Sequence, residues 1–445
     1  QRQMCIRDRY MSKTSREIVL DILLDIDRND RFAGDALGGA LRANQFMNKK
    51  ERAYISRLTE GVTEQKIRLD YILNQFSKTK IKKSKPVIRC ILRMAAYEIF
   101  YMDAVPDEAA CNEYVNLTGK RGFRTLKGYV NGVLRSVCRN KAAITYPSME
   151  DGVESYLSVK YSVPEELAGY FLKKFGDNET EEMFEAFNKD KSTYIRCNTK
   201  KTDIAGLTAA LEAEGVTVTN EGIDKRIDYA LKISGYDYLG GLKSFRDGLF
   251  FVQDISSMLA SQGGFIKRDA YVIDVCAAPG GKSINAALMA DIGHVSSRDI
   301  SGRKVSLIKE NAERLGIDNI TYKVWDAVKK DEESVEKADV LICDLPCSGL
   351  GIIGRKPDIK YNVTYEKIKE LALLQRKILS TVWEYVKKDG ILIYSTCTVT
   401  PEENAENTEW LVNNYPFELI GKPEQIMPQD GTGDGFYIAR LKRTE

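Results

Sequence analysis

Hydrophobic positions between residues 15 and 139 recur with the period of an α-helix. One apolar stripe is formed by Ile18, Leu20, Ile22, Leu23 and Ile26, and a second by Ala53, Ile55, Leu58, Val62 and Ile67. A third segment, residues 87–100, is apolar nearly all round, which is typical of a buried helix. Strand signals are scarce, so we predict an all-α domain over residues 11–140. Residues 1–10 carry no usable pattern, and we expect them to lie outside the folded protein, with Met11 as a plausible native start.

The pattern changes after residue 140. Residues 141–190 predict a helical linker region, and residues 191–248 give strand, helix and strand, which indicates a small α+β subdomain. From Asp269 onward strands and helices alternate: the predicted strands are YVIDVCA, HVSSRDI, ITYKVWDA, ADVLICDLP, GILIYSTCTV and GFYIARLKR. We also predict a long helix over Tyr365–Lys388 and a helix over residues 401–414. This alternation predicts a doubly wound, Rossmann-like α/β domain over residues 249–445.

Composition narrows the chemistry. The chain of 445 residues has one histidine, His294, and nine cysteines, with no C-x-x-C pair. Catalysis through imidazole would depend on His294 alone, and a Cys/His zinc site would need closer ligand spacing, so we expect no metal. Scattered cysteines in odd number favour reduced thiols and a cytoplasmic protein. We find no apolar run of membrane-spanning length and no secretory signal pattern. We also expect the protein to be a monomer.

Charge is distributed unevenly along the chain. Residues 11–140 hold 24 Lys/Arg against 15 Asp/Glu, whereas residues 141–445 hold 39 against 48. Residues 77–93 carry seven cations and no acid, and Pro86 suits the first turn of the helix that follows. A basic loop before a helix N-terminus favours phosphate binding, with a solvated surface charge run as the alternative.

A glycine-containing turn follows the first strand of the α/β domain. It consists of Cys276, Ala277, Ala278, Pro279, Gly280, Gly281 and Lys282. The turn matches neither G-x-G-x-x-G nor the Walker A pattern, but its glycines permit close backbone approach to a ligand. Asp299, Asp326 and Asp344 follow the next three strands, and ligands of such sheets bind at the carboxyl ends of the strands. Asp299 lies about 20 residues after Gly280, the spacing of a ribose-binding acid, and Asp326 could meet an adenine edge.

Two cysteines occupy matching positions after neighbouring strands. Cys347 follows the fourth predicted strand and Cys397 ends the fifth, so adjacent parallel strands would bring both thiols to the edge that carries the glycine turn. Thr400, Pro401 and Glu403 fit the N-cap, first turn and capping box of a helix. A nearby helix N-terminus would favour the thiolate form of Cys397 without histidine. We regard the other cysteines as buried, inert side chains.

These segments carry a resemblance to known proteins. DVCAAPGGKS, DLPCSGLG, YSTCTVTPEEN and the terminal DGFYIARLKR resemble the S-adenosylmethionine-dependent RNA cytosine-C5 methyltransferases. SREIVLDILL, VPDEAACNEYV and KGYVNGVLR are similar to segments of the RNA-binding NusB antiterminators. The combination resembles the bacterial RsmB (Sun) family over nearly all of residues 11–445. The expected fold is therefore a NusB-like helical domain, a small middle subdomain and a class I methyltransferase domain.

The resemblance implies a function and residue roles. The resemblance implies methylation of C5 of cytosine 967 in 16S rRNA, in an unassembled or partly assembled small subunit. By this resemblance Cys397 attacks C6 of the base, Cys347 assists release of the product, and Asp344 orients the base or the methyl donor. The turn 276–282, Asp299 and Asp326 match positions that bind S-adenosylmethionine, and Arg303 matches a basic position near the ribose. The alternatives are methylation of tRNA or another rRNA site, and a non-catalytic RNA-binding assembly or antitermination factor.

Overall fold

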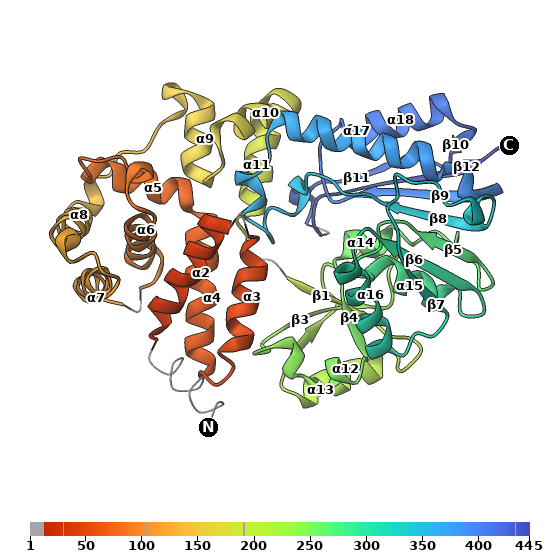
Figure 1. Cartoon of the computed structure of the whole chain (residues 1–445), viewed down its shortest axis with the longest axis horizontal. Coiled ribbons are helices and arrows are strands. Elements are labelled where there is room, and N and C mark those ends of the chain that lie inside the picture. Colours follow the sequence, from red (N-terminus) through yellow and green to blue (C-terminus); the bar gives the residue numbers. More distant parts are fainter. Residues whose placement is uncertain (1–12, 30, 104, 190–191, 432) are drawn as a thin grey trace. The chain divides into compact units, whose positions relative to one another are not determined.

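The computed structural model describes residues 13–29, 31–103, 105–189, 192–431 and 433–445 (Figure 1). The suggested start at Met11, and residues 1–10 with Cys5, lie outside these ranges. The chain forms two compact units. The first holds the described residues up to Phe184 together with Lys356–Asn362, and the second holds Glu185–Arg355 and Val363–Glu445.

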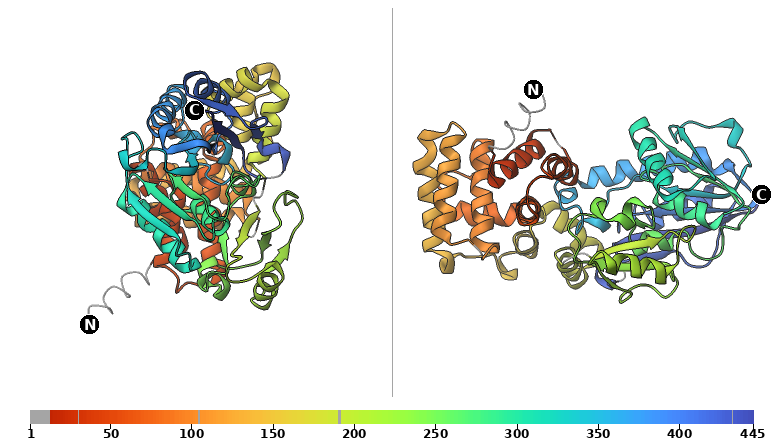
Figure 2. Two further views of the ribbon diagram at one scale, coloured as in Figure 1. Left: turned by 90° about the vertical axis from the view of Figure 1, so that its right-hand side faces the viewer. Right: turned by 90° about the horizontal axis from the view of Figure 1, so that it is seen from below.

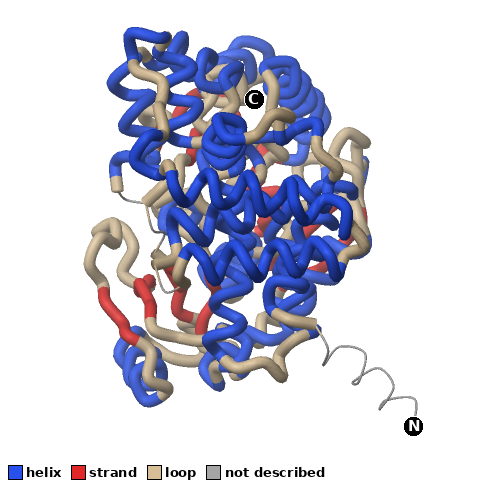
Figure 3. The backbone as a smooth tube through the Cα atoms, turned by 90° about the vertical axis from the view of Figure 1, so that its left-hand side faces the viewer, coloured by secondary structure: helices blue, strands red, loops and turns tan. Residues whose placement is uncertain are grey.

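Helices build the described part of the first unit (Figure 3), as the apolar stripes predict. The helices are α2 (Ser15–Asn29), α3 (Ala33–Ala43), α4 (Lys49–Glu64), α5 (Lys66–Phe76), α6 (Pro86–Tyr101), α7 (Asp107–Lys120), α8 (Lys127–Arg139), α9 (Val153–Tyr161) and α10 (Glu165–Phe175). Helix α11 (Asp177–Phe187) spans the boundary between the units. Asn48 and Glu51 form a capping box that starts α4, and Pro86 occupies the first turn of α6, whose apolar face is buried in the core.

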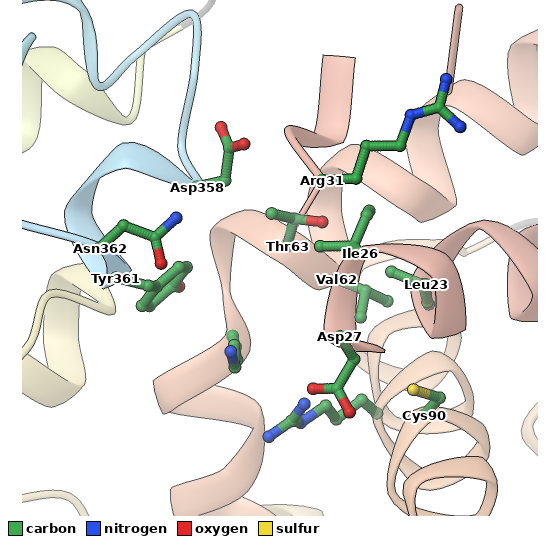
Figure 4. A pocket seen from close by; sticks show the side chains of 12 residues that line it. Leu23, Ile26, Asp27, Arg31, Val62, Thr63, Cys90, Asp358, Tyr361 and Asn362 are labelled. Carbon is green, nitrogen blue, oxygen red and sulfur yellow. The ribbon is translucent and has the colours of Figure 1, made fainter. Parts of the chain in front are cut away.

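A short segment from the C-terminal half of the sequence belongs to the first unit. Lys360 is fully buried there, and its amino group donates to the carbonyl of Glu64 at 2.9 Å, at the C-terminal end of α4. The Tyr361 hydroxyl donates to the same carbonyl at 3.0 Å, and the Asp358 carboxylate accepts from the backbone N–H of Ala33 at 2.8 Å. A cation at a helix C-terminus stabilises its unpaired carbonyls. Figure 4 shows the pocket of about 130 Å³ that Asp358, Tyr361 and Asn362 line together with α2 and α4.

The second unit begins with a small antiparallel sheet in the order β2-β3-β1-β4. Its elements are β1 (Thr193–Cys197), α12 (Ile204–Ala213), β2 (Thr217–Thr219), β3 (Ala230–Ser234), α13 (Lys243–Arg246), β4 (Phe250–Val252) and α14 (Ile255–Leu259). The predicted strand, helix and strand are β1, α12 and β2. Strands β3 and β4 complete the sheet, and β4 lies just beyond Gly248, where we expected the subdomain to end.

The larger sheet has eight strands in the order β10-β12-β9-β8-β5-β6-β7, with β11 paired to β12. Its elements are β5 (Tyr271–Asp274), α15 (Gly281–Met289), β6 (His294–Asp299), α16 (Gly302–Leu315), β7 (Ile320–Val324), β8 (Ala338–Asp344), α17 (Tyr365–Val382), β9 (Val386–Thr396), α18 (Ala405–Asn414), β10 (Phe417–Leu419), β11 (Glu424–Ile426) and β12 (Phe436–Arg443). Strands β5 to β9 pair in parallel, and β12 pairs antiparallel with β9.

Alternate residues of the central strands face opposite layers of helices. Val340 and Ile342 of β8 pack in one core with α15 and α16, whereas Leu341 and Cys343 pack in the other core with α17 and α18. The green and blue helices accordingly cover two faces of the sheet (Figures 1 and 2). This arrangement confirms the predicted doubly wound fold. Within the described ranges no helix combines the length and apolar composition needed to cross a membrane.

Two predicted helices were wrong in their bounds. Helix α17 ends at Val382, not at Lys388, and β9 begins at Val386. The polar residues 387–389 lie in an irregularity of the strand, because Val386 pairs with Ala338 and Ile391 with Val340 on either side of them. Two exposed ion pairs, Lys387 with Asp339 at 2.7 Å and Asp389 with Lys442 at 2.6 Å, connect this irregularity to the neighbouring strands. Helix α18 begins at Ala405, so the N-cap predicted at Thr400 and the helical position of Pro401 are wrong. The short strands β10 and β11 were not predicted.

Candidate active site

The glycine turn connects the carboxyl end of β5 to α15. Gly280 has a φ of +105° and precedes the first residue of α15, and its N–H donates to the carbonyl of Ala277 at 2.7 Å. A Cβ atom at Gly280 would lie 3.2 Å from both Ile284 and Ile308. The turn therefore requires glycine for its backbone and for packing, and it leaves the backbone of Ala278 to Gly280 at the edge of the sheet.

A buried carboxylate lies beneath this turn. Asp274 ends β5, is fully buried, and accepts from the Ser283 hydroxyl at 2.6 Å through Oδ2, while Oδ1 has no hydrogen-bond partner. Burial raises the pKa of Asp274 to about 7. Burial also raises the pKa of the Cys276 thiol, which favours the inert, protonated form. The sequence reasoning missed Asp274, although it directly precedes the turn at a strand end.

Asp299 holds the turn from the neighbouring strand. It ends β6, and its carboxylate accepts from the backbone N–H of Ala278 at 3.0 Å and pairs with Lys304 at 3.2 Å. Lys304 therefore contacts this acid, whereas the side chain of Arg303, which the resemblance assigns to the cofactor, is exposed. Asp326 lies beyond β7 and accepts from the backbone N–H of Val328 at 3.2 Å, which is the geometry of a turn residue.

Lys282 connects the glycine turn to the strand that leads to Cys347. Its buried amino group donates to Asp344 Oδ2 at 2.7 Å and to the Ser257 hydroxyl at 3.0 Å. Asp344 in turn accepts from Ser395 of β9 at 2.8 Å. The Lys282 ammonium also lies 4.9 Å from the centre of the Phe436 ring. The Asp344 side chain thus links the glycine turn, β8 and β9.

The two predicted thiols meet at the carboxyl ends of adjacent strands. Cys347 Sγ and Cys397 Sγ are 3.2 Å apart, as the parallel pairing of β8 and β9 leads us to expect. The hydrogen bond to Cys397 and burial raise the pKa of Cys347 well above that of a free thiol. Cys347 therefore keeps its proton at neutral pH, so that its S–H group is available as a hydrogen-bond donor to Cys397.

Glu403 fixes the loop of Cys347 to the loop of Cys397. Its buried carboxylate accepts from the backbone N–H of Ser348 at 2.8 Å, the Ser348 hydroxyl at 2.5 Å, Thr400 at 2.7 Å and Gln375 at 3.0 Å. Gln375 also donates to the carbonyl of Pro346 at 2.9 Å. Burial raises the pKa of Glu403, and four donors favour its ionised form. Sequence reasoning assigned Glu403 only to a helix cap.

Asn404 and a close glycine contact hold the Cys397 loop from the other side. The Asn404 amide donates to the carbonyl of Thr398 at 3.0 Å and accepts from Thr396 at 2.5 Å. The N–H of Gly351 donates to the carbonyl of Cys397 at 3.1 Å, and a Cβ at Gly351 would meet that carbonyl and the backbone of Gly435. The positions of both thiols are therefore set by backbone contacts on each flank.

A doubly wound sheet with a glycine turn at its carboxyl edge defines a Rossmann-like cofactor-binding fold, and here that edge also carries a thiol pair. Family models match residues 266–442 as 16S rRNA methyltransferase RsmB/F and residues 13–139 as the NusB family. A probable ribosomal RNA small subunit methyltransferase B of Bacillus subtilis is 35% identical, covering 97% of this chain and 100% of its own length. The protein of the same description from Synechocystis is 31% identical over 97% of this chain and 99% of its own. The chain belongs to the RsmB family of methyltransferases.

Solved structures share the fold. The crystal structure of PH0851 has a TM-score of 0.82 and 25% sequence identity, covering 97% of this chain and 99% of that one. NSun6 from Pyrococcus horikoshii, solved with SFG, has a TM-score of 0.55 and 22% identity over 63% of this chain and 98% of its own. The first similarity extends over both units, and the second supports the fold alone.

Proposed function

We propose that the protein transfers a methyl group from S-adenosylmethionine to C5 of a cytosine in 16S rRNA, the family's cytosine 967. The observation that carries this proposal is the pair of thiols 3.2 Å apart at the ends of β8 and β9. Attack on a pyrimidine ring requires a thiolate, and we propose that Cys397 supplies it, with Cys347 in place of an imidazole as its hydrogen-bond partner. The bacterial relatives are described as small-subunit rRNA methyltransferases, and we propose the same cytoplasmic substrate here.

The residues at the glycine turn fit the methyl donor. Gly280 and Gly281 let a ligand approach the backbone, and the first N–H groups of α15 favour its carboxylate. The Asp299 carboxylate at the end of β6 suits ribose hydroxyls, with Lys304 beside it. We assign Asp326 to the adenine edge and Arg303 to the rim of the same site. Bound there, the donor supplies an electrophilic methyl group on a sulfonium.

Cys397 supplies the nucleophile in the proposed reaction. A lone pair of its thiolate forms a bond to C6 of the cytosine, and the electrons of the C5–C6 double bond move into the ring. C5 then forms the bond to the methyl carbon, whose bond to the donor sulfur breaks with the electron pair left on that sulfur. The C5 proton next leaves to a basic group or water, the double bond re-forms, and the C6–S bond returns its electrons to Cys397.

Cys347 assists the last step. Its hydrogen bond stabilises the Cys397 thiolate as nucleophile and again as leaving group, because both states carry the charge on the same sulfur. Asp344 is held by Lys282 and Ser395 a few residues from Cys347, and we propose that it orients the base. The target base must be unpaired or flipped out of its helix to reach the thiol.

Transfer of label tests the proposed function. The full-length protein, labelled S-adenosylmethionine and transcripts of 16S rRNA, 23S rRNA and tRNA are incubated together, and 5-methylcytosine is mapped in each product. We expect label only in 16S rRNA, at one cytosine. Label in tRNA or 23S rRNA would show that the substrate is another RNA. No label in any RNA would overturn the proposal and would favour a non-catalytic RNA-binding factor.

A further inference from the structure

The first unit contains a basic groove that the proposed reaction does not use. The groove has a volume of about 590 Å³. Its floor is α5 with Tyr71 and Asn74, one wall is the loop with Lys80, Lys82 and Lys83, and the other wall is α9, which packs against α5 (Figure 1). All of these elements belong to the first unit.

The three lysines of this wall lack counterions. Each is exposed, and none forms an ion pair with a described residue. One groove-lining acid is already neutralised, because Asp70 accepts two hydrogen bonds from Arg93, both at 2.7 Å. The other, Glu165, lies at the start of α10. With Asp70 neutralised, three lysines face one remaining carboxylate, so the groove has a net positive charge, which attracts a polyanion.

Two stacked aromatic rings extend outward from the groove, because Tyr71 lines it and Tyr146 packs on Tyr71. The rings of Tyr71 and Tyr146 stack with centroids 6.3 Å apart, and the Arg68 guanidinium lies 5.3 Å from the Tyr146 ring. Tyr146 remains 44% exposed. Gln75 holds this segment on α5, because its amide donates to the carbonyl of Thr145 at 3.0 Å and accepts from the N–H of Thr145 at 3.1 Å. An exposed, anchored ring that continues from a groove with a row of lysines is typical of surfaces that bind single-stranded nucleic acid.

We propose that this groove binds a single-stranded segment of RNA, with phosphates on Lys80, Lys82 and Lys83 and a base stacked on Tyr146. The inference deepens the proposed function, since it takes RNA as the substrate and says where the first unit holds it. Single-stranded RNA is favoured over duplex because a duplex keeps its bases stacked on one another and offers none to Tyr146. Such contacts position the RNA but read little of its sequence.

Fluorescence anisotropy of the full-length protein with a labelled single-stranded RNA of about 12 mixed-sequence nucleotides tests the groove. We compare the triple variant Lys80→Gln/Lys82→Gln/Lys83→Gln with a control of equal charge change, Lys49→Gln/Lys50→Gln/Lys120→Gln, whose lysines lie outside the groove. Each phosphate contact on a single strand contributes about 0.7 to the slope of log K against log salt. The groove variant should lower that slope by about 2, whereas the control should leave it close to the parent value.

Tyr146→Ala tests the stacking contact. It should weaken binding about 5- to 100-fold with an unchanged salt slope, and Tyr146→Phe should keep the affinity within about twofold. Equal effects of the two lysine triples, or parent-like binding by Tyr146→Ala, would overturn the proposal, as would a duplex that binds as tightly as the single strand. Methyl transfer is measured separately. An inactive protein that still binds RNA through these residues would overturn the proposed function and leave the groove standing.

Discussion

Removal of the Glu403 carboxylate should loosen both thiol loops at once. Glu403→Ala leaves four donors on Ser348, Thr400 and Gln375 without their acceptor in a buried environment. An unsatisfied buried donor costs about 1–3 kcal/mol, and these losses are not additive. We therefore expect the free energy of unfolding to fall by about 3–5 kcal/mol, as for other buried charged networks that lose one partner. Glu403→Gln keeps the volume and one accepting oxygen, and should cost about 1–3 kcal/mol.

The same substitution should also slow catalysis in the protein that remains folded. Displacement of a reacting group by about 1 Å can cost about 100-fold in rate, so Glu403→Gln should slow single-turnover methyl transfer by a factor of this order at temperatures where the variant is folded. Glu409→Gln is the matched control, because Glu409 is exposed on α18. Calorimetric melting and single-turnover rates are measured on the parent protein and on the variants Glu403→Ala, Glu403→Gln and Glu409→Gln. A Glu403→Gln variant with reduced melting temperature but a parent-like rate would refute the positioning role, and parent-like values of both would refute the energetic reasoning.

Three further changes test other parts of the structure. Burial raises the pKa of Asp274 to about 7, so the folded state binds a proton that the unfolded state has lost, and stability falls as pH rises from about 4 to about 7. Asp274→Asn should remove this pH dependence from chemical unfolding curves, by about 4 kcal/mol across that window; curves with unchanged pH dependence would contradict the shift. Gly280→Ala should weaken S-adenosylmethionine binding in calorimetry by about tenfold or more, because alanine tolerates the φ of +105° poorly and its Cβ meets Ile284 and Ile308. Lys360→Met removes a donor from the carbonyl of Glu64 and should raise hydrogen exchange at the C-terminal turn of α4; unchanged protection there would show that the contact does not stabilise the helix end.

Much of the fold follows from the sequence because its signals are local. The period of apolar residues is set by neighbours a few positions apart, and it predicts the helices of the first unit and the alternation in the second. The predicted ends of helices were wrong where the local structure depends on residues that are distant in the sequence. Lys387 and Asp389 were predicted to end a helix, yet the pairing of Val386 with Ala338 and of Ile391 with Val340 places them in β9.

The sequence also predicts part of the candidate site, namely the residues that lie at strand ends and in the glycine turn. The strand order that follows from alternation brings Cys347 and Cys397 to one edge, and the turn 276–282 is recognisable by its glycines. The role of Glu403 was not predictable, because the backbone N–H that it accepts from lies at Ser348, 55 residues earlier. Arg303 and Lys304 are neighbours in the first turn of α16, and the choice of which one meets Asp299 depends on helix rotation. The segment 356–362 carries no sequence signal for its place in the first unit.

Covalent capture of RNA by the cysteine variants tests the central proposal most directly. The parent protein and the variants Cys397→Ala and Cys347→Ala are incubated with labelled 16S rRNA and S-adenosylmethionine, and resolved on a denaturing gel. The proposal predicts that Cys347→Ala accumulates a protein–RNA adduct, because the thiolate leaving group has lost its hydrogen-bond donor, while Cys397→Ala forms none and transfers no methyl group. An adduct formed by Cys397→Ala and absent from Cys347→Ala would contradict the proposal, because it would reverse the roles of the two thiols.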